Sequence, residues 1–391
     1  MAIVRGVARV AVVAAALTCM MDTGSGAGLP DGWVQTTASL SEGRSCLAAA
    51  SLGNQAFFAG GFLGGGVFSK AVDIHDSDTG LWSTASLSKA RQDLSAAVVG
   101  TQVLFAGGWD GHASCSVVDI YDATTRNWST ANLSVARHQM CAVTIGSKVC
   151  FAGGRQYPEY DRGVSNVVDI YDSAANTWSV ATLSEARFSL NATAVGSLAL
   201  LGGGWTGSAA SGTIDIYRAD LGSWFTAQLP HARFCGGATT AGDKALFAGG
   251  WVDWGYHATA TVDLWDMSEN SWSSASLSEA RAKLGATSIG GYALFGGGGG
   301  PSYQRSQSLD IYDAGTGTWS EAALSVARAE LAATSTSKAA LFAGGACEVY
   351  PKPGGGYIFT YSDRVDIFTI PEPATLVLVA LGGLVALRRR R

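Results

Sequence analysis

Four residue types recur in one order and at nearly constant spacing along most of this 391-residue chain. In the second copy, Arg91 is followed 16 residues later by Gly107 and Gly108, then by Asp119, and nine residues after that by Trp128. The Arg of the next copy follows nine residues after the Trp, and the copies are 46 to 50 residues long. Such a period requires small units that stack on one another, and it excludes most folds with a single core. The seven repeated Arg residues are Arg44, Arg91, Arg137, Arg187, Arg233, Arg281 and Arg328.

Each copy predicts four short β-strands. Two apolar runs follow the Arg and flank a turn such as Gly146-Ser147, which is typical of a β-hairpin. The third run alternates around the repeated Asp, and the Trp begins the fourth. One four-stranded unit cannot bury both of its faces, whereas seven units around an axis cover one another. The predicted fold is an all-β, seven-bladed β-propeller.

The two ends of the repeat array predict how the ring closes. The seventh copy reaches Asp366 and lacks the Trp-containing strand, while Trp33 begins an unassigned strand at residues 33–40. We therefore expect this N-terminal strand to complete the seventh blade, so that strands from both ends of the array share one sheet.

The Gly pair, the Tyr of the third strand and the Trp, at a period near 50 residues, resemble the Kelch repeat. The resemblance extends over residues 32–369, which we assign to the propeller domain. It implies a Kelch-type β-propeller, a module that often binds partners near one end of its central channel.

Residues 1–27 are typical of a secretory signal. Arg5 and Arg9 precede the short apolar run of residues 10–18, and small residues at 25–27 suit cleavage. A signal helix is therefore expected at the N-terminus, ahead of the propeller.

The C-terminal segment, residues 370–391, contains three features in order. Pro371, Glu372 and Pro373 precede the largely apolar residues 374–387, a short predicted transmembrane helix, and a cluster of basic residues follows. This order resembles the PEP-CTERM sorting tail, which implies a membrane-embedded exosortase as processing partner, often in cells that make exopolysaccharide. The predicted route is an inner-membrane intermediate and then the cell envelope or the extracellular space; a plain membrane anchor is the alternative. The basic cluster is Arg388, Arg389, Arg390 and Arg391.

Composition limits the remaining function classes. The chain is 47% apolar and 15% charged, which excludes an intrinsically disordered protein. Its net charge of −5, without a basic run inside the propeller, gives no support for nucleic-acid binding. No nucleophile, phosphate-binding or metal-ligand motif is present, so we assign no catalytic residue, metal or cofactor. For the six cysteines outside the signal, the sequence allows either disulfides or buried free thiols. These are Cys46, Cys115, Cys141, Cys150, Cys235 and Cys347.

The repeated Arg and Asp residues occur in every blade, which favours a structural role over a catalytic one. We expect the Arg to tie the corner before each first strand to the backbone or to the third-strand Asp. A functional ring of these residues is the alternative.

The loops between second and third strands vary most, and they share a face of the propeller with the Arg corners. Aromatic residues gather in these loops, where they suit stacking on sugars or contacts with peptides. The predicted binding face is centred on blades five and seven, and blade seven has the longest loop, residues 346–364. Trp109, Trp205 and Trp251 directly follow a Gly pair and could instead pack the rim of the channel. The candidate binding residues are Trp109, Trp205, Trp251, Trp254, Tyr256, Tyr350, Tyr357 and Tyr361.

Two function classes follow. The first is an exported, non-catalytic binding module for a protein or glycan partner. The second is an enzyme on the same scaffold, either an exported sugar-directed isomerase or a copper radical oxidase, since one propeller supports many chemistries.

Overall fold

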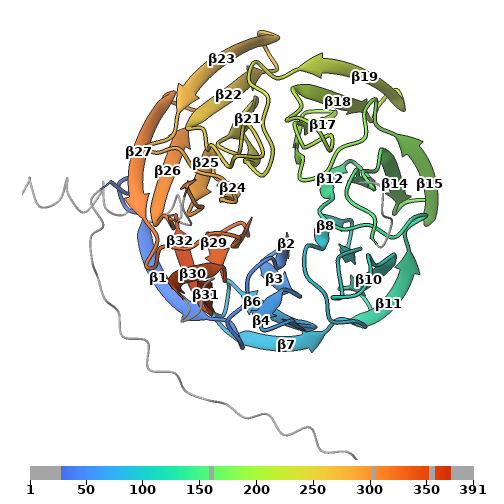
Figure 1. Cartoon of the computed structure of the whole chain (residues 1–391), viewed down its shortest axis with the longest axis horizontal. Helices are drawn as coiled ribbons and strands as arrows, with labels where there is room; N and C mark the ends of the chain where they lie inside the picture. Colours follow the sequence, from blue (N-terminus) through green and yellow to red (C-terminus); the bar gives the residue numbers. More distant parts are fainter. Residues whose placement is uncertain (1–27, 158–162, 302–303, 352–356, 371–391) are drawn as a thin grey trace, which may run out of the picture.

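The computed structural model describes residues 28–157, 163–301, 304–351 and 357–370. In this part of the chain, seven four-stranded antiparallel sheets stand around a central axis (Figure 1), which confirms the predicted all-β, seven-bladed propeller. The expected signal helix and the expected membrane helix of the tail lie outside the described residues. Among the residues described, no helix is long and apolar enough to cross a membrane.

In the first six blades, the strands follow chain order from the innermost to the outermost. Blades one to three contain β2 (Ala48–Leu52), β3 (Gln55–Ala59), β6 (Ala71–Asp76) and β7 (Trp82–Ser86); β8 (Ser95–Val99), β9 (Gln102–Ala106), β10 (Val117–Asp122) and β11 (Asn127–Asn132); and β12 (Cys141–Ile145), β13 (Lys148–Ala152), β14 (Val167–Asp172) and β15 (Thr177–Thr182). Blades four to six contain β16 (Asn191–Val195), β17 (Leu198–Gly202), β18 (Thr213–Arg218) and β19 (Ser223–Gln228); β20 (Gly237–Ala241), β21 (Lys244–Ala248), β22 (Thr261–Asp266) and β23 (Ser271–Ser276); and β24 (Gly285–Ile289), β25 (Tyr292–Gly296), β26 (Ser308–Asp313) and β27 (Thr318–Ala323).

Blade seven joins the two ends of the array, as predicted. It contains β28 (Ala332–Ser335), β29 (Ala339–Ala343), β32 (Arg364–Thr369) and, outermost, β1 (Val34–Ser39). β1 runs antiparallel to β32, with Val34 opposite Thr369. The Gln35 side chain donates a hydrogen bond to Asp366 Oδ1 at 3.0 Å. The ring is thus closed by backbone pairing between segments more than 300 residues apart in sequence.

The hydrophobic core lies between the blades. Seven clusters among the described residues each combine side chains of two neighbouring blades. Between blades one and two, for example, Phe57 and Val72 pack with Phe105 and the partly buried Trp128. The repeated Trp therefore covers the outer end of the contact between blades. Burial of this apolar surface is the main force that holds the ring together.

Each repeated Arg is buried and forms an ion pair with the Asp of the same blade. The Arg187 guanidinium also donates to the carbonyl oxygen of Gly203 at 2.8 Å. In six blades, the second oxygen of the Asp accepts a backbone N–H from a Ser at the preceding corner. These contacts confirm the structural role expected of the Arg and Asp repeats.

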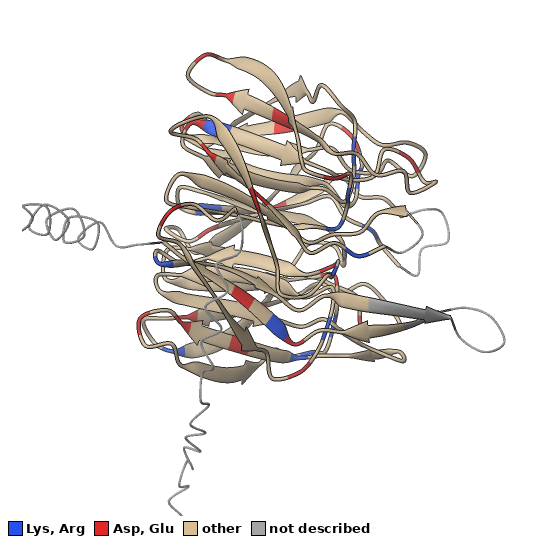
Figure 2. Cartoon of the chain, turned by 90° about the vertical axis from the view of Figure 1, so that its left-hand side faces the viewer, with Lys and Arg blue, Asp and Glu red and all other residues tan. Residues whose placement is uncertain are grey.

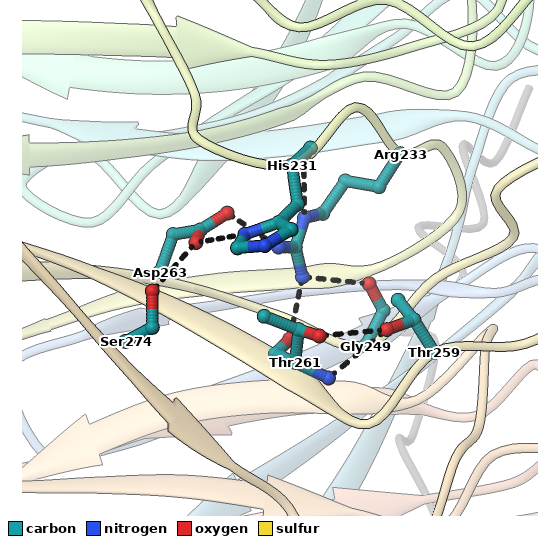
Figure 3. A network of polar contacts seen from close by, with 7 residues as sticks. All are labelled: His231, Arg233, Gly249, Thr259, Thr261, Asp263 and Ser274. Atoms are coloured by element: carbon teal, nitrogen blue, oxygen red, sulfur yellow. Dashed lines mark hydrogen bonds and ion pairs between the residues drawn. The ribbon is translucent and has the colours of Figure 1, made fainter.

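Blade five makes this contact differently, because Pro230 stands where the other blades have Ser and has no N–H to donate. The His231 side chain takes its place, with Nδ1 2.8 Å from Asp263 Oδ1 (Figure 3). Arg233 binds the same carboxylate and donates to the carbonyl oxygen of Thr261 at 2.6 Å. The side chain replaces a lost backbone donor, so the corner keeps its geometry.

The segment expected as the longest loop is not an irregular loop. Residues 346–364 contain β30 (Ala346–Pro351) and β31 (Tyr357–Tyr361), which pair as a two-stranded ribbon with a register shift after Ala346. A shorter ribbon, β4 (Phe62–Gly64) with β5 (Val67–Phe68), occupies the same position in blade one. Pairing between the two strands satisfies backbone N–H and C=O groups of this long connection.

Cys46, Cys115, Cys141, Cys150 and Cys235 are thiols outside any disulfide. Cys141 lies opposite Ala152 rather than Cys150, as the turn at Gly146 predicts. The alternative of disulfides, which the sequence leaves open, therefore has no support in the described residues.

Candidate functional site

A cavity of about 1060 Å³ opens at one end of the central channel. The Arg corners and the loops between second and third strands surround it, and we call this side of the propeller the mouth face. All seven blades contribute residues to its lining. Its volume is at the upper end of the range for small-molecule sites, which leaves room for more than one sugar-sized ligand.

A ring of seven residues encircles the cavity, each two positions after a repeated Arg. All seven have positive φ, between 52° and 59°, although none is Gly. Their backbones form a closed circle, in which each N–H donates to the carbonyl oxygen of the equivalent residue in the preceding blade at 2.7–3.0 Å. The circle closes from Cys46 N to Glu330 O at 3.0 Å. The members of this axial ring are Cys46, Asp93, Gln139, Ser189, Cys235, Lys283 and Glu330.

In the axial ring, all seven residues share one backbone conformation, whereas their side chains differ in type. A left-handed residue other than Gly costs about 1–2 kcal/mol, and here the hydrogen-bonded circle holds that conformation in every blade. The Gly pairs make room for the corner, since a Cβ at Gly107 would lie 2.4 Å from the carbonyl oxygen of Arg137 in the next blade. The ring side chains all line the cavity, and nothing in the repeat dictates their type.

Ionisable side chains occupy one half of the axial ring, in blades six, seven, one and two. Lys283 pairs with Glu330, and the Cys46 thiol lies 3.5 Å from Glu330 Oε2. Burial, together with the nearby charge of Glu330, raises the pKa of Asp93 to about 6. The same two causes raise the pKa of the Cys46 thiol well above its ordinary value. Asp93 can therefore exchange a proton near neutral pH, whereas the thiol stays protonated.

Neutral polar groups occupy the other half of the cavity. Gln139 Oε1, Asn191 Nδ2 and the indole Nε1 of Trp251 are buried and have no hydrogen-bond partner among the residues that the structure describes. Trp251 is only 6% exposed, so its N–H is a donor held inside the protein at the cavity wall. Buried polar groups are normally satisfied, and leaving one unsatisfied costs about 1–3 kcal/mol. The three residues line the cavity, so a rotation of their side chains would offer these atoms to a ligand that carries both donors and acceptors.

An aromatic platform borders the cavity on the side of blades four and five. Trp254, 48% exposed, stacks on Phe234 with ring centres 6.1 Å apart and contacts Trp205 at 5.1 Å. Tyr256, also 48% exposed, packs edge-on against Trp251 at 5.5 Å. The loop that carries both exposed rings is held by its own contacts, such as the pairing of His257 Nδ1 with Asp253 Oδ2 at 2.8 Å. The platform is therefore presented in a defined position.

A second row of aromatic rings borders the cavity on the side of blades seven, one and two. Tyr361 packs edge-on against Phe62 with ring centres 5.5 Å apart, Phe62 contacts Phe68 at 5.4 Å, and Phe68 contacts Trp109 at 5.3 Å. Tyr361 and Trp109 both line the cavity. The polar axial ring thus lies between two aromatic borders.

The structure brings only some of the predicted binding residues together. Trp109, Trp251, Tyr256 and Tyr361 line the cavity, whereas Trp205 and Trp254 lie beside it in the platform. Trp205 and Trp251 are largely buried, in keeping with the alternative that they pack the rim. Tyr350 and Tyr357 are placed only by the backbone pairing of their ribbon.

The sequence interpretation missed the axial ring. Its signal is nevertheless visible: the position two after each Arg holds six different residue types while the Arg before it never changes. Among the described residues, no group of three or more His, Cys, Asp and Glu side chains could hold a metal ion.

Comparison with known proteins supports both parts of this architecture. Residues 90–132 match the Kelch motif, and residues 369–391 match the PEP-CTERM protein-sorting motif. No curated protein matches the chain. A solved structure titled "Structure of YjhT" is similar in fold, with a TM-score of 0.56 and 14% identity over 70% of this chain and 96% of that one. The chain is therefore a seven-bladed β-propeller that carries a Kelch motif and ends in a PEP-CTERM protein-sorting motif.

Proposed function

We propose that the chain is an exported, non-catalytic binding module whose ligand is a carbohydrate chain held at the mouth face. The observation that supports this most is the combination of three buried, unpartnered polar atoms with aromatic borders around one cavity. Sugars carry hydroxyl groups that both donate and accept, and their C–H faces pack on aromatic rings. Export follows from the sorting motif, which implies processing by an exosortase.

A protein partner is the other ligand class for the same face, since exposed aromatic side chains also anchor protein interfaces. The cavity favours the glycan, because the residues that carry these polar atoms line a concave site, which a flat protein surface would not fill.

A sugar-directed isomerase is the second candidate function, and Asp93 is the observation in its favour. A carboxyl group with a pKa of about 6 beside the charged Glu330 is suited to proton transfer. The isomerase function predicts that the purified chain interconverts sugar isomers and that Asp93→Asn abolishes this activity. The copper radical oxidase has no comparable observation in its favour among the described residues, where no group of three or more His, Cys, Asp and Glu side chains could hold a metal ion.

The test of binding uses the full-length chain, solubilised in detergent, on an array of neutral and acidic glycans. Trp254→Ala and Tyr256→Ala should each weaken binding about tenfold or more, because each removes an exposed aromatic contact. Tyr357→Ala tests the contribution predicted for the ribbon of blade seven.

Phe225→Ala is the matched control, since Phe225 is 43% exposed but lies on the outer strand β19, away from the mouth face. It should leave affinity unchanged. Equal losses of glycan affinity in Trp254→Ala and Phe225→Ala would contradict a site at the mouth face. Glycan binding that neither substitution weakens would contradict it too.

A further inference from the structure

The last strand of the propeller ends on the side opposite the mouth face. We call this side the turn face; it consists of the turns between first and second strands and between third and fourth strands. In each blade, the residue after the third strand donates its backbone N–H to a carbonyl of the first turn. Ser77 donates in this way to Asn54 at 2.8 Å, and in blade seven Ile370 donates to Lys338 at 3.4 Å. Ile370 therefore occupies the turn-face position that the repeat assigns to it.

No spacer separates the propeller from the sorting motif. The motif match begins at Thr369, the last residue of β32, which pairs with Val34 on one side and Ala339 on the other. Ile370 packs against the hydrophobic cluster between blades six and seven. The sorting tail thus starts at a residue that is fixed to the body of the propeller.

The turn face carries many carboxylates. The Asp that ends the third strand caps its own turn in five blades, and these turns lie along the left edge of Figure 2. Two of these carboxylates pair with Lys148 and Lys244, so the face carries charges of both signs and is not a basic patch that would bind anionic lipids. Attachment to a membrane would therefore depend on the tail. The five capping residues are Asp76, Asp122, Asp172, Asp266 and Asp313.

We infer that, as long as the sorting tail is held in a membrane, the turn face lies against the lipid surface and the mouth face points away from it. Only residues 371–373 separate Ile370 from the apolar run at residues 374–387, and three residues span at most about 10 Å. The turn face therefore stays close to any membrane that holds this run. The cavity would then be open to ligands that arrive from outside, before and during processing. This inference rests on the sorting motif and on the position of Ile370, and it holds whatever the ligand of the cavity is.

The experiment measures the distance of each face from a membrane. The full-length chain is reconstituted into vesicles of phosphatidylethanolamine and phosphatidylglycerol, 3:1, that contain a fluorescent acceptor lipid. A donor dye is attached at Thr125→Cys on the turn face or at His112→Cys on the mouth face, in a background where Cys46 and Cys235 are Ser. Both positions are exposed and belong to blade two, at opposite ends of β10. Six residues of strand separate them by roughly 20 Å.

Energy transfer should be clearly stronger from position 125 than from position 112. The same labelled proteins in vesicles without acceptor give the reference intensity for each dye. Equal transfer, stronger transfer from position 112, or transfer from neither position would overturn the inference. Glycan binding is read separately on the natural chain, which keeps Cys46 and Cys235 in the cavity, so a failed orientation test and a failed binding proposal can be told apart.

Discussion

The side chains that hold each blade together are the buried Arg and Asp. In blade three, Arg137 donates to the carbonyl oxygens of Gly153 and Val167, both at 2.6 Å, and pairs with Asp169. Asp169 Oδ1 also accepts the backbone N–H of Ser134 at 2.8 Å. One ion pair thus joins the corner, the end of the second strand and the third strand. An isolated buried charge is very unfavourable, so each partner depends on the other.

We expect Asp169→Asn to lower the free energy of unfolding by about 3–5 kcal/mol, because it leaves the Arg137 charge buried without its counter-ion. The matched control is Asp172→Asn in the same blade, which removes the same charge from a partly exposed pair with Lys148. The control should cost far less, because solvent screens that pair. Urea unfolding measures the free energy of unfolding of both variants. Equal losses of stability would show that the buried ion pair contributes no more than the partly exposed one.

The pKa of Asp93 predicts a stability that depends on pH. Because burial and Glu330 raise this pKa to about 6, the folded chain holds the proton more tightly than the unfolded chain. The free energy of unfolding should therefore fall as pH rises from about 4 through about 6. Asp93→Asn should remove this loss of stability and be more stable than the natural chain by about 3 kcal/mol at pH 7.5, with no difference near pH 4.

Glu330→Gln should instead lower the free energy of unfolding at pH 7.5. Burial acts to raise the pKa of Glu330, but the charge of Lys283 more than offsets it and lowers that pKa. The charged form is therefore the stabilising one at neutral pH. Thermal unfolding at several pH values checks both variants. If both substitutions changed the melting temperature at pH 7.5 in the same direction, the directions given for the two pKa values would be contradicted.

At the scale of elements, the decisive contact is the pairing of β1 with β32. β1 is the outermost strand of blade seven and supplies the buried Leu40 just beyond its end. Without β1, one edge of β32 would lose its backbone partners, and the cluster between blades seven and one would lose apolar cover. Blade seven therefore depends on a segment from the start of the chain.

Deletion of residues 28–40 should lower the melting temperature sharply and make the chain prone to aggregation. Addition of a peptide covering residues 33–40 should restore part of the lost stability, because the open edge of β32 provides its pairing site. A deletion variant as stable as the full chain would show that β1 is dispensable.

At the scale of the whole molecule, the propeller is a closed ring in two respects. The seven hydrophobic clusters link each blade to the next, and the axial ring joins all seven corners by backbone hydrogen bonds. Loss of one blade would expose two such clusters and break the axial ring. The blades are therefore expected to unfold together rather than one at a time.

A single transition in urea should be seen both by tryptophan fluorescence and by far-ultraviolet circular dichroism, with coincident midpoints. Asp169→Asn should move that transition to lower urea without splitting it. Two separated transitions in either variant would mean that groups of blades unfold independently.

The sequence alone was enough to predict the propeller, its seven blades, its closure by the N-terminal strand, the role of the Arg and Asp repeats and the sorting tail. These features depend on contacts that repeat locally or at a constant interval, so periodicity reveals them. The candidate site depended on the tertiary structure. Six neighbouring pairs of the axial ring are 46 to 50 residues apart in sequence, Cys46 and Glu330 are 284 apart, and the side chains of all seven meet around one cavity only in the closed propeller. Likewise, Trp254 and Phe62 stand in separate segments between second and third strands until the blades place them on opposite borders of that cavity, because the spacing along the chain does not say which side chains converge around the axis.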